Sequence, residues 1–392
     1  MFIANGSRFG TFFRVDQSVI LLSRFPGDRM NMNMKRIRKS ALSIGLSSMT
    51  ALTVSGWAQA EDVGSSLEGK VAPVQPGVSV QQPAAPDGDL DGFTCDGRPH
   101  VALTLSGGGG RGVAHIGVLK VLEEEGIKPD FIAGSSIGAL IGVLYASGRT
   151  PQELEQMCLS GELKKGLLPS GLKWQAIKST PGYALKRMIG MHPPIGMYKS
   201  KTMAKFISKE LKPGVTQLDQ LKIPVAVIAT NLLDTSPVWI RKGKITDAVT
   251  ASTAIPFVYQ PVELNNALLV DGGLRSQLPT EVAAASCSPF VIGVRVHSKL
   301  PEISKKRIRN WLDYSDRVLT MVMAELERKG MENADVLIEP DLGDIETRSF
   351  EPEDMAIAIK SGEVAARKML PELRRRLARY NATASSGANQ SH

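Results

Sequence analysis

The chain has 392 residues, of which 43% are apolar and 22% charged; this globular composition allows two or three domains and excludes a fully disordered, collagen-like or multi-span membrane protein. Three cysteines are too few and too scattered for a disulfide scaffold or a zinc ribbon. The formal net charge is +8, but residues 1–60 hold eight Lys or Arg and only two acidic residues, so the remaining chain is nearly neutral and no nucleic-acid partner is expected.

The first predicted element is an export signal. Residues 34–39 are basic, residues 40–57 are largely apolar, and Ala58 and Ala60 form a small-x-small cleavage site. We expect cleavage after Ala60, and a mature protein that is periplasmic or secreted. A membrane anchor is the alternative, although five Ser, two Thr and two Gly make the apolar stretch too polar for a convincing span.

A glycine-rich loop opens the folded part of the chain, after a predicted flexible linker at residues 61–97. Residues 101–105 predict a short apolar strand, and residues 113–125 have helical spacing. Between them, Ser106 is followed by the glycine loop, Gly107, Gly108, Gly109, Gly110, Arg111 and Gly112. Such a loop directs unpaired backbone N–H groups toward one point near a helix N-terminus, and so predicts an anion-binding site.

Two kinds of chemistry use a loop of this type. The spacing of Gly107, Gly109 and Gly112 fits the dinucleotide-binding fingerprint. That fingerprint needs an acid at the end of a strand about 20 residues on, and here Asp130 precedes a strand instead. In an acyl-transfer enzyme, the same N–H groups stabilise a tetrahedral oxyanion. A lone glycine fingerprint is a weak signal, so the next motif decides between the two.

The second motif is G-x-S-x-G, at residues 134–138. It lies between a predicted strand and an apolar helix, which is the context of a nucleophile elbow. Gly134 and Gly138 suit a tight turn, and the turn lifts the Ser136 hydroxyl clear of the sheet, next to a helix N-terminus that favours negative charge. The sequence therefore predicts that Ser136 is a nucleophile, with a chance Gly-Ser loop as the alternative.

A serine nucleophile needs a group that accepts its proton. Among five histidines, only His297 fits the order Ser-Asp-His of α/β-hydrolases, with Asp271 as the acid. A lone His at a strand end is, however, more often structural. Asp271 is the better candidate, because it ends a short apolar strand at the tight turn with Gly272 and Gly273, where sites in α/β sheets form. A plain Asp-Gly turn is the alternative.

Together, these three motifs resemble those of the patatin-like phospholipase family in residue type, order and spacing. The sequence Ala-Ser-Thr-Ala-Ile-Pro at residues 251–256 is similar to a further block of the family, and residues 334–340 resemble a late strand of bacterial members. The resemblance covers roughly residues 98–345. One departure follows the Asp-Gly-Gly turn: the family often has an Asn before Leu-Pro, where this chain has Ser276 and Gln277.

The resemblance implies a three-layer α/β/α sandwich with a mostly parallel central sheet, which the strand–loop–helix order also favours. It implies a Ser–Asp dyad in which Ser136 is the nucleophile and Asp271 accepts its proton. Four backbone N–H groups would form the oxyanion hole, those of Gly108, Gly109, Gly110 and Arg111. The remaining motif glycines would shape the turns, namely Gly107, Gly112, Gly134, Gly138, Gly272 and Gly273.

The expected reaction is hydrolysis of a lipid acyl ester through an acyl-enzyme on Ser136, with a phospholipid or another acyl ester as substrate. No metal-ligand motif occurs in the sequence, so no metal or cofactor is expected. Burial of Asp271 would make it a stronger base than a free carboxylate. A phospholipase, a lysophospholipase and an esterase all fit. The rival functions are a scaffold that keeps the fold without turnover, and a nucleotide-binding enzyme.

Three regions are candidates for peripheral contact with a membrane. Residues 161–200 mix apolar and Lys side chains, and predict either a lid that enters lipid or an ordinary helical cap over the core. Residues 301–330 predict a helix pair that begins with four basic residues, Lys305, Lys306, Arg307 and Arg309. Residues 352–380 end in Arg374, Arg375, Arg376 and Arg379. Basic residues of this kind attract anionic headgroups; the alternative is that they suit the dipole at a helix C-terminus while the helix docks onto the core.

The predicted domains are an N-terminal extension with its signal (1–60), the linker (61–97), a patatin-like catalytic domain (98–345), a C-terminal helical segment (346–380) and a disordered tail (381–392). Within the helical segment, residues 352–380 predict a second helix pair. Leu370, Leu373 and Leu377 share one face of it, and we expect that face to dock onto the core. The oligomeric state is left open.

Overall fold

The computed structural model describes residues 13–15, 18–20, 100–168, 198–285, 289–297, 300 and 302–388. The chain divides into two units, residues 1–78 and 79–392. In the first unit, β1 (Phe13–Val15) pairs antiparallel with β2 (Ser18–Ile20). The predicted signal, the linker and most of the possible lid at 161–200 lie outside the described residues.

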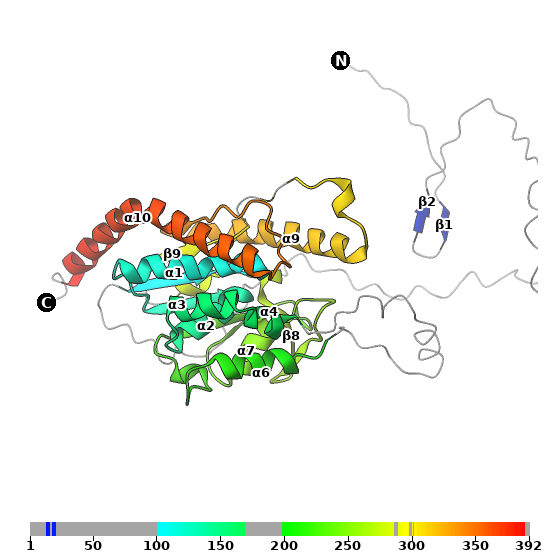
Figure 1. Cartoon of the computed structure of the whole chain (residues 1–392), viewed down its shortest axis with the longest axis horizontal. Helices are drawn as coiled ribbons and strands as arrows, with labels where there is room; N and C mark the ends of the chain where they lie inside the picture. The colour runs from blue at the N-terminus through cyan, green and yellow to red at the C-terminus, as the bar shows by residue number, and fades with distance from the viewer. Residues whose placement is uncertain are drawn as a thin grey trace, which may run out of the picture. The chain divides into compact units, whose positions relative to one another are not determined.

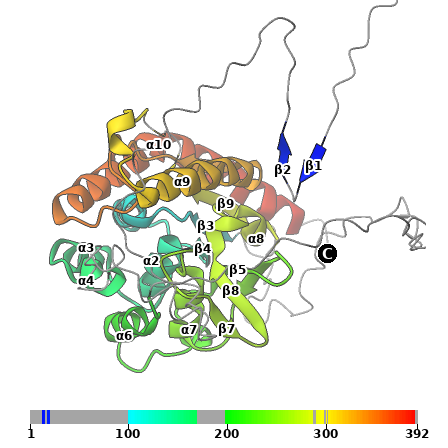
Figure 2. The ribbon, with the colours of Figure 1, turned by 90° about the vertical axis from the view of Figure 1, so that its right-hand side faces the viewer.

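An eight-stranded sheet lies at the centre of this unit (Figure 1). Its strands are β3 (Val101–Leu105), β4 (Phe131–Ser135), β5 (Val225–Asn231), β6 (Pro237–Ile240), β7 (Val262–Leu264), β8 (Ala267–Asp271), β9 (Phe290–Val294) and β10 (Val336–Ile338). Five of them run parallel in the order β10-β9-β3-β4-β5, and β8 and β7 continue the sheet antiparallel beyond β5. β6 also pairs antiparallel with β5. Figure 2 shows the strands in turn from β9 to β7.

Helices cover both faces of the sheet. The α-helices are α1 (Ala114–Glu124), α2 (Ile137–Ala146), α3 (Pro151–Leu159), α4 (Glu162–Leu167), α6 (Lys201–Glu210), α7 (Ile245–Ser252), α8 (Thr280–Ala284), α9 (Trp311–Lys329) and α10 (Pro352–Ala388). Short 3₁₀ turns are η1 (Gly109–Val113), η3 (Leu218–Gln220), η4 (Gly272–Leu274), η5 (Lys305–Arg307) and η6 (Gly330–Asn333). No helix in the described part of the chain has both the length and the apolar character needed to cross a bilayer.

Alternating side chains of the strands divide the core into two layers. In β3, Leu103 and Leu105 face a large cluster formed with α1, α2, α3, α7 and α10, and Ala102 faces a smaller cluster under α8. Burying a Leu side chain in such a cluster contributes about 1.5–3 kcal/mol. The predicted three-layer α/β/α sandwich with a mostly parallel sheet is confirmed.

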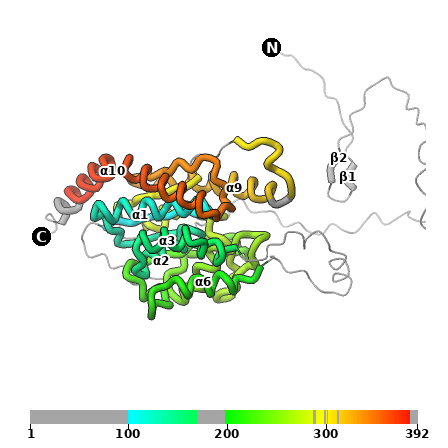
Figure 3. The backbone as a smooth tube through the Cα atoms, in the orientation of Figure 1, coloured from blue at the N-terminus to red at the C-terminus, as the bar shows by residue number. Residues whose placement is uncertain are grey.

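The C-terminal helix packs along α1 (Figures 1 and 3). The two backbones approach closely where each helix has a glycine: a Cβ on Gly117 would lie 1.9 Å from the Ile359 carbonyl oxygen, and one on Gly362 would lie 2.0 Å from that of Ala114. The predicted docking face is confirmed, since Leu373 is fully buried, with Leu370 and Leu377 packed beside it. This packing makes α10 part of the main core.

The two predicted helix pairs are wrong, because each is one α-helix. η5 and η6 only flank the single helix α9, and α10 runs unbroken from Pro352 to Ala388. Pro371 lies inside α10 without ending it, since core contacts hold the helix on both sides. The predicted disordered tail is also wrong for residues 381–388, which continue the helix. Extending an existing helix costs less than nucleating one, and Thr383 Oγ1 donates to the Arg379 carbonyl there.

Candidate active site

Ser136 lies at the sharp turn between β4 and α2. Its backbone has φ 53° and ψ −122°, a conformation that L-residues rarely adopt and that is typical of a nucleophile elbow. The turn fits because position 138 has no side chain: a Cβ on Gly138 would lie 2.3 Å from the Leu105 carbonyl oxygen. The Ser136 N–H donates to Ser252 Oγ at 2.9 Å, which ties the elbow to the end of α7. The turn therefore depends on the glycine at position 138, and a hydrogen bond from α7 stabilises it.

The Ser136 hydroxyl donates directly to the Asp271 carboxylate, with 2.6 Å between Oγ and Oδ2. Asp271 ends β8, which pairs antiparallel with β5, so its side chain reaches the elbow from a strand two places away from β4. The other oxygen, Oδ1, accepts the Gly273 N–H at 2.8 Å. The turn of Asp271, Gly272 and Gly273 thus fixes one carboxylate oxygen and leaves the other for the serine.

The carboxylate is almost completely enclosed, with Asp271 only 1% exposed. Burial raises the pKa of Asp271 to about 6, although the hydrogen bonds from Ser136 and Gly273 act in the opposite direction. A carboxylate with this pKa is ionised at neutral pH and accepts a proton more readily than a free aspartate does. The arrangement suits a general base.

His297 does not join this pair. Its side chain is buried, with Nδ1 lying 3.7 Å from Glu327 Oε1 and 3.4 Å from Gln277 Nε2. Among the residues that the structure describes, no hydrogen bond or ion pair links His297 to Ser136 or Asp271. The structure therefore assembles the serine and the aspartate, and places the histidine with a different acid.

The glycine loop follows β3 and becomes η1 before α1. Two of its four predicted oxyanion donors are engaged elsewhere: the Gly110 N–H donates to the Thr347 carbonyl at 2.7 Å, and the Arg111 N–H donates to that of Gly108 at 3.1 Å as the 3₁₀ turn begins. The N–H groups of Gly108 and Gly109 donate to no described residue. The prediction is therefore wrong for Gly110 and Arg111, and the two earlier glycines keep free donors.

The side chain of Arg111 has a structural use that the sequence did not reveal. It is buried, and Nε donates to the Val296 carbonyl at 3.0 Å while Nη1 donates to that of Ile345 at 2.8 Å. Arg111 thereby joins the loop after β3 to the loop after β9 and to the segment that precedes α10. The glycine loop is fixed by residues from the last third of the chain.

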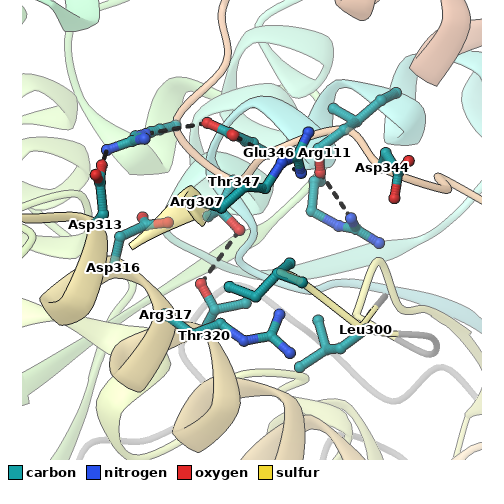
Figure 4. Close-up of a pocket in the computed structure, with 13 residues that line it drawn as sticks. Arg111, Leu300, Arg307, Asp313, Asp316, Arg317, Thr320, Asp344, Glu346 and Thr347 are labelled. Carbon is teal, nitrogen blue, oxygen red and sulfur yellow. Dashed lines mark hydrogen bonds and ion pairs between the residues drawn. The ribbon is translucent and has the colours of Figure 1, made fainter. Parts of the chain in front are cut away.

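A small charged cavity lies beside this loop, between α9 and residues 344–348 (Figure 4). Its volume is about 70 Å³, whereas sites for drug-sized ligands usually measure about 300–1,000 Å³. Two of its acidic residues pair with one arginine: Arg348 contacts Asp313 at 2.7 Å and Glu346 at 3.1 Å. The cavity has room for a few water molecules and is too small for an acyl chain.

The fold and the site define an α/β protein with a nucleophile elbow, whose serine is hydrogen-bonded to an aspartate. A family model, the patatin-like phospholipase, matches residues 103–284, which include Ser136 and Asp271. The protein YqhO of Bacillus subtilis is 30% identical over 223 residues, which cover 53% of this chain and 74% of YqhO. The chain belongs to the patatin-like phospholipase family, as its motifs predict.

Further similarities cover smaller parts of other proteins. An NTE family protein of Mycobacterium tuberculosis is 33% identical over 202 residues, so the chain spans about half of that relative (51% of this chain and 49% of the relative). The lysophospholipase NTE1 of Saccharomyces cerevisiae is 30% identical over 196 residues, 48% of this chain and 10% of the yeast protein. The crystal structure of VipD from Legionella pneumophila covers 70% of this chain and 67% of VipD, with 15% identity and a TM-score of 0.40.

Proposed function

We propose that this chain is a serine lipid acyl hydrolase that works through a Ser136–Asp271 dyad. The observation that carries the proposal is the 2.6 Å hydrogen bond from Ser136 Oγ to a buried carboxylate, at a strained elbow. Membership of the patatin-like phospholipase family supports a lipid ester as substrate. Phospholipids, lysophospholipids and simpler acyl esters all offer the ester that this chemistry cleaves.

The proposed mechanism uses three groups: Ser136, Asp271 and the N–H groups of the glycine loop. Ser136 Oγ attacks the acyl carbonyl while its proton passes to Asp271 Oδ2. The tetrahedral oxyanion accepts hydrogen bonds from the N–H groups of Gly108 and Gly109, and the N-terminus of α2 favours its charge. When the intermediate collapses, the C–O bond to the leaving alcohol breaks and Asp271 returns the proton to it. A water molecule that gives its proton to Asp271 then attacks the acyl carbonyl; the bond to Ser136 Oγ breaks, Asp271 returns the proton to Ser136, and the carboxylic acid leaves.

Release of p-nitrophenol from short and long acyl esters by the full-length chain tests this proposal. We expect Ser136→Ala and Asp271→Asn to abolish turnover on an intact fold, and His297→Ala to retain measurable turnover. A fluorophosphonate probe should label the wild type and not Ser136→Ala, which separates an enzyme from a scaffold. Full activity of Ser136→Ala would rule out the mechanism, and complete loss in His297→Ala on an intact fold would favour a triad.

We further propose that α9 and the turn before it contact an anionic lipid surface. Tyr314, Val318, Met321 and Val322 lie on one outward face of α9 and are between 41% and 61% exposed. The exposed basic turn, with Lys305, Lys306, Arg307 and Arg309, comes just before α9 and this apolar stripe. This combination suits a surface that has both acyl chains and negative headgroups.

The order of the strands supports an orientation in which the basic turn and Ser136 face the same lipid surface. β3, β4 and β9 are parallel, so their carboxyl ends lie at one edge of the sheet. The glycine loop follows β3, Ser136 follows β4, and the segment containing the basic turn follows β9. The basic turn and the nucleophile therefore belong to the same edge, as an enzyme acting on lipid at a surface requires.

Export through the predicted signal is part of the proposal. The basic and apolar stretches at residues 34–57 and the cleavage sequence ending at Ala60 support it. N-terminal sequencing of the protein recovered from a producing cell tests it, with Glu61 expected as the first residue. A mature protein that retains residues 34–60 would contradict cleavage and favour an anchor.

A further inference from the structure

A fully buried carboxylate lies behind the glycine loop. Glu327, on α9, is 0% exposed; its Oε1 accepts the Val296 N–H at 3.0 Å and its Oε2 accepts the His297 N–H at 2.9 Å. Burial alone would raise the pKa of Glu327, but interactions with His297, Ser106 and Arg295 outweigh it, and that pKa lies below its ordinary value. An ionised glutamate therefore holds the chain where it leaves β9.

The end of β9 in turn supports one of the two free oxyanion donors. A Cβ on Gly108 would lie 2.3 Å from Val296 Cγ2 and 3.3 Å from His297 Cε1, so the loop backbone rests directly on these two side chains. Ser106, just before the loop, is tied to the same place, since its Oγ accepts the Val296 N–H at 3.2 Å. A shift of the β9 end would therefore move the Gly108 N–H.

Gln277 fills the space between the glycine loop and the aspartate turn. Its side-chain oxygen would lie 2.7 Å from a Cβ on Gly107 and 2.1 Å from a Cβ on Gly273, the residue whose N–H holds Asp271. Its backbone carbonyl accepts the Gly107 N–H at 3.1 Å. The side-chain nitrogen lies 3.4 Å from His297 Nδ1. Gln277 thus touches both halves of the candidate active site and the histidine behind them.

We propose that Gln277, His297 and Glu327 are positioning residues, which set the distance between the oxyanion donors and the Ser136–Asp271 pair. The inference rests on the proposed hydrolase function. It gives His297 a role that is not proton transfer, and it extends the catalytic unit to α9, beyond the part of the chain that the family model matches. None of the three residues is expected to touch the substrate.

Displacement of an oxyanion donor acts on the transition state and leaves ground-state binding largely unchanged. Complete removal of one donor lowers kcat by about 10²–10³-fold. In Glu327→Gln, the amide places an N–H₂ group against the backbone N–H donors of Val296 and His297. We therefore expect this variant to lower kcat by about 10–100-fold, with KM changed by less than about threefold. The measurement is steady-state hydrolysis of a soluble p-nitrophenyl ester by the full-length chain.

A second buried acid supplies the matched control. Glu210 on α6 is 3% exposed and pairs with Arg149 at 3.1 Å, with no described contact to the glycine loop or the dyad. Glu210→Gln should lower Tm to a similar degree and leave kcat within about twofold. If Glu327→Gln lowers kcat no more than Glu210→Gln does, the positioning role is overturned.

Gln277 provides an independent test of spacing. Gln277→Met keeps the length of the side chain, and Gln277→Ala leaves a gap between the two loops. We expect Gln277→Ala to lower kcat by at least about tenfold and Gln277→Met to recover most of it. Equal kcat in the two variants would contradict the spacing role. A wild type without esterase activity would refute the proposed function itself, whereas an active wild type with unaffected variants would refute only this inference.

Discussion

Ser136 and Asp271 are 135 positions apart in the chain, yet their side chains share a hydrogen bond of 2.6 Å inside the protein. The serine is placed by a local turn and the aspartate by the pairing of β8 with β5. A serine at an elbow is a common feature, but a serine whose proton already points at a buried carboxylate has a ready acceptor.

Asp271→Asn should be inactive and more stable than the wild type. The raised pKa means that the fold disfavours the charged carboxylate. The stability that the protonated Asp271 contributes is therefore fully present below the unfolded pKa of 3.8 and is lost as pH rises through about 6. At about 1.4 kcal/mol per pKa unit, the neutral amide removes a cost of at most about 3 kcal/mol at neutral pH. Calorimetry at pH 7.5 measures Tm, and a Tm well below the wild type would contradict the shift.

The acid limb of the pH–rate profile should reflect the same carboxylate. Asp271 accepts a proton only when ionised, so we expect kcat/KM to fall below pH of about 6 and to reach a plateau above it. A fluorogenic ester whose product is detected equally across the range avoids an artefact from p-nitrophenol ionisation. A profile that stays flat down to pH 4.5, with the fold intact, would show that another group accepts the proton.

Gly138→Ala should destabilise the protein through the elbow. The added Cβ would lie 2.3 Å from the Leu105 carbonyl, so α2 must move away from β3, and overpacking of this kind costs about 1–3 kcal/mol or more. Gly126→Ala is the comparison, because a Cβ there meets nothing within 4 Å. The only loss of stability expected in that variant comes from the positive φ of 69°. Urea unfolding of both variants gives the difference, and equal losses would mean that the close approach at Gly138 is unimportant.

Two acidic substitutions on α9 should weaken lipid binding. The double variant Val318→Glu and Met321→Glu places charge on the exposed stripe, and we expect at least about a tenfold loss of binding to vesicles of ether-linked phosphatidylglycerol and phosphatidylcholine. Ether lipids are not hydrolysed by an esterase, so binding is measured without turnover. The turnover of a soluble short-chain ester should be unchanged.

The control for this surface lies on another helix. Val364 on α10 is 58% exposed, and Val364→Glu should bind vesicles as the wild type does. Raising the salt concentration should weaken wild-type binding, since the basic turn contributes through charge. Equal losses in the α9 and α10 variants would contradict a specific docking face, and a stripe that instead mediates self-association would be revealed by a change in oligomeric state.

The residues that the sequence predicted well are those whose position depends on neighbours in the chain. Ser136 follows from a strand, a turn and a helix within a few residues, and Asp271 from the end of a strand. The oxyanion prediction partly failed because the Gly110 N–H is taken by Thr347, a partner that no local pattern reveals. Periodicity identified the buried face of α10, although it did not show that the helix continues through Pro371.

The sequence also did not reveal Gln277 and Glu327, because their partners are distant in the chain. A glutamine before Leu-Pro and a glutamate on an amphipathic helix are ordinary residues until the fold buries them against the glycine loop. The one signal in the sequence was the departure from the family pattern at Ser276 and Gln277. Their significance comes from contacts between segments that are distant in sequence.

The pairing of β3 with β9 has a consequence for how the protein forms. Val101 lies opposite Phe290, so β3, which precedes the glycine loop, pairs with β9, a strand that is synthesised much later. Closing such a long loop is entropically costly, and proteins dominated by distant pairings fold slowly. The elbow can form early from adjacent residues, whereas the surroundings of the oxyanion donors are completed only when β9, α9 and α10 have been added. We therefore expect the elbow at Ser136 to form before the surroundings of the Gly108 and Gly109 N–H groups are complete.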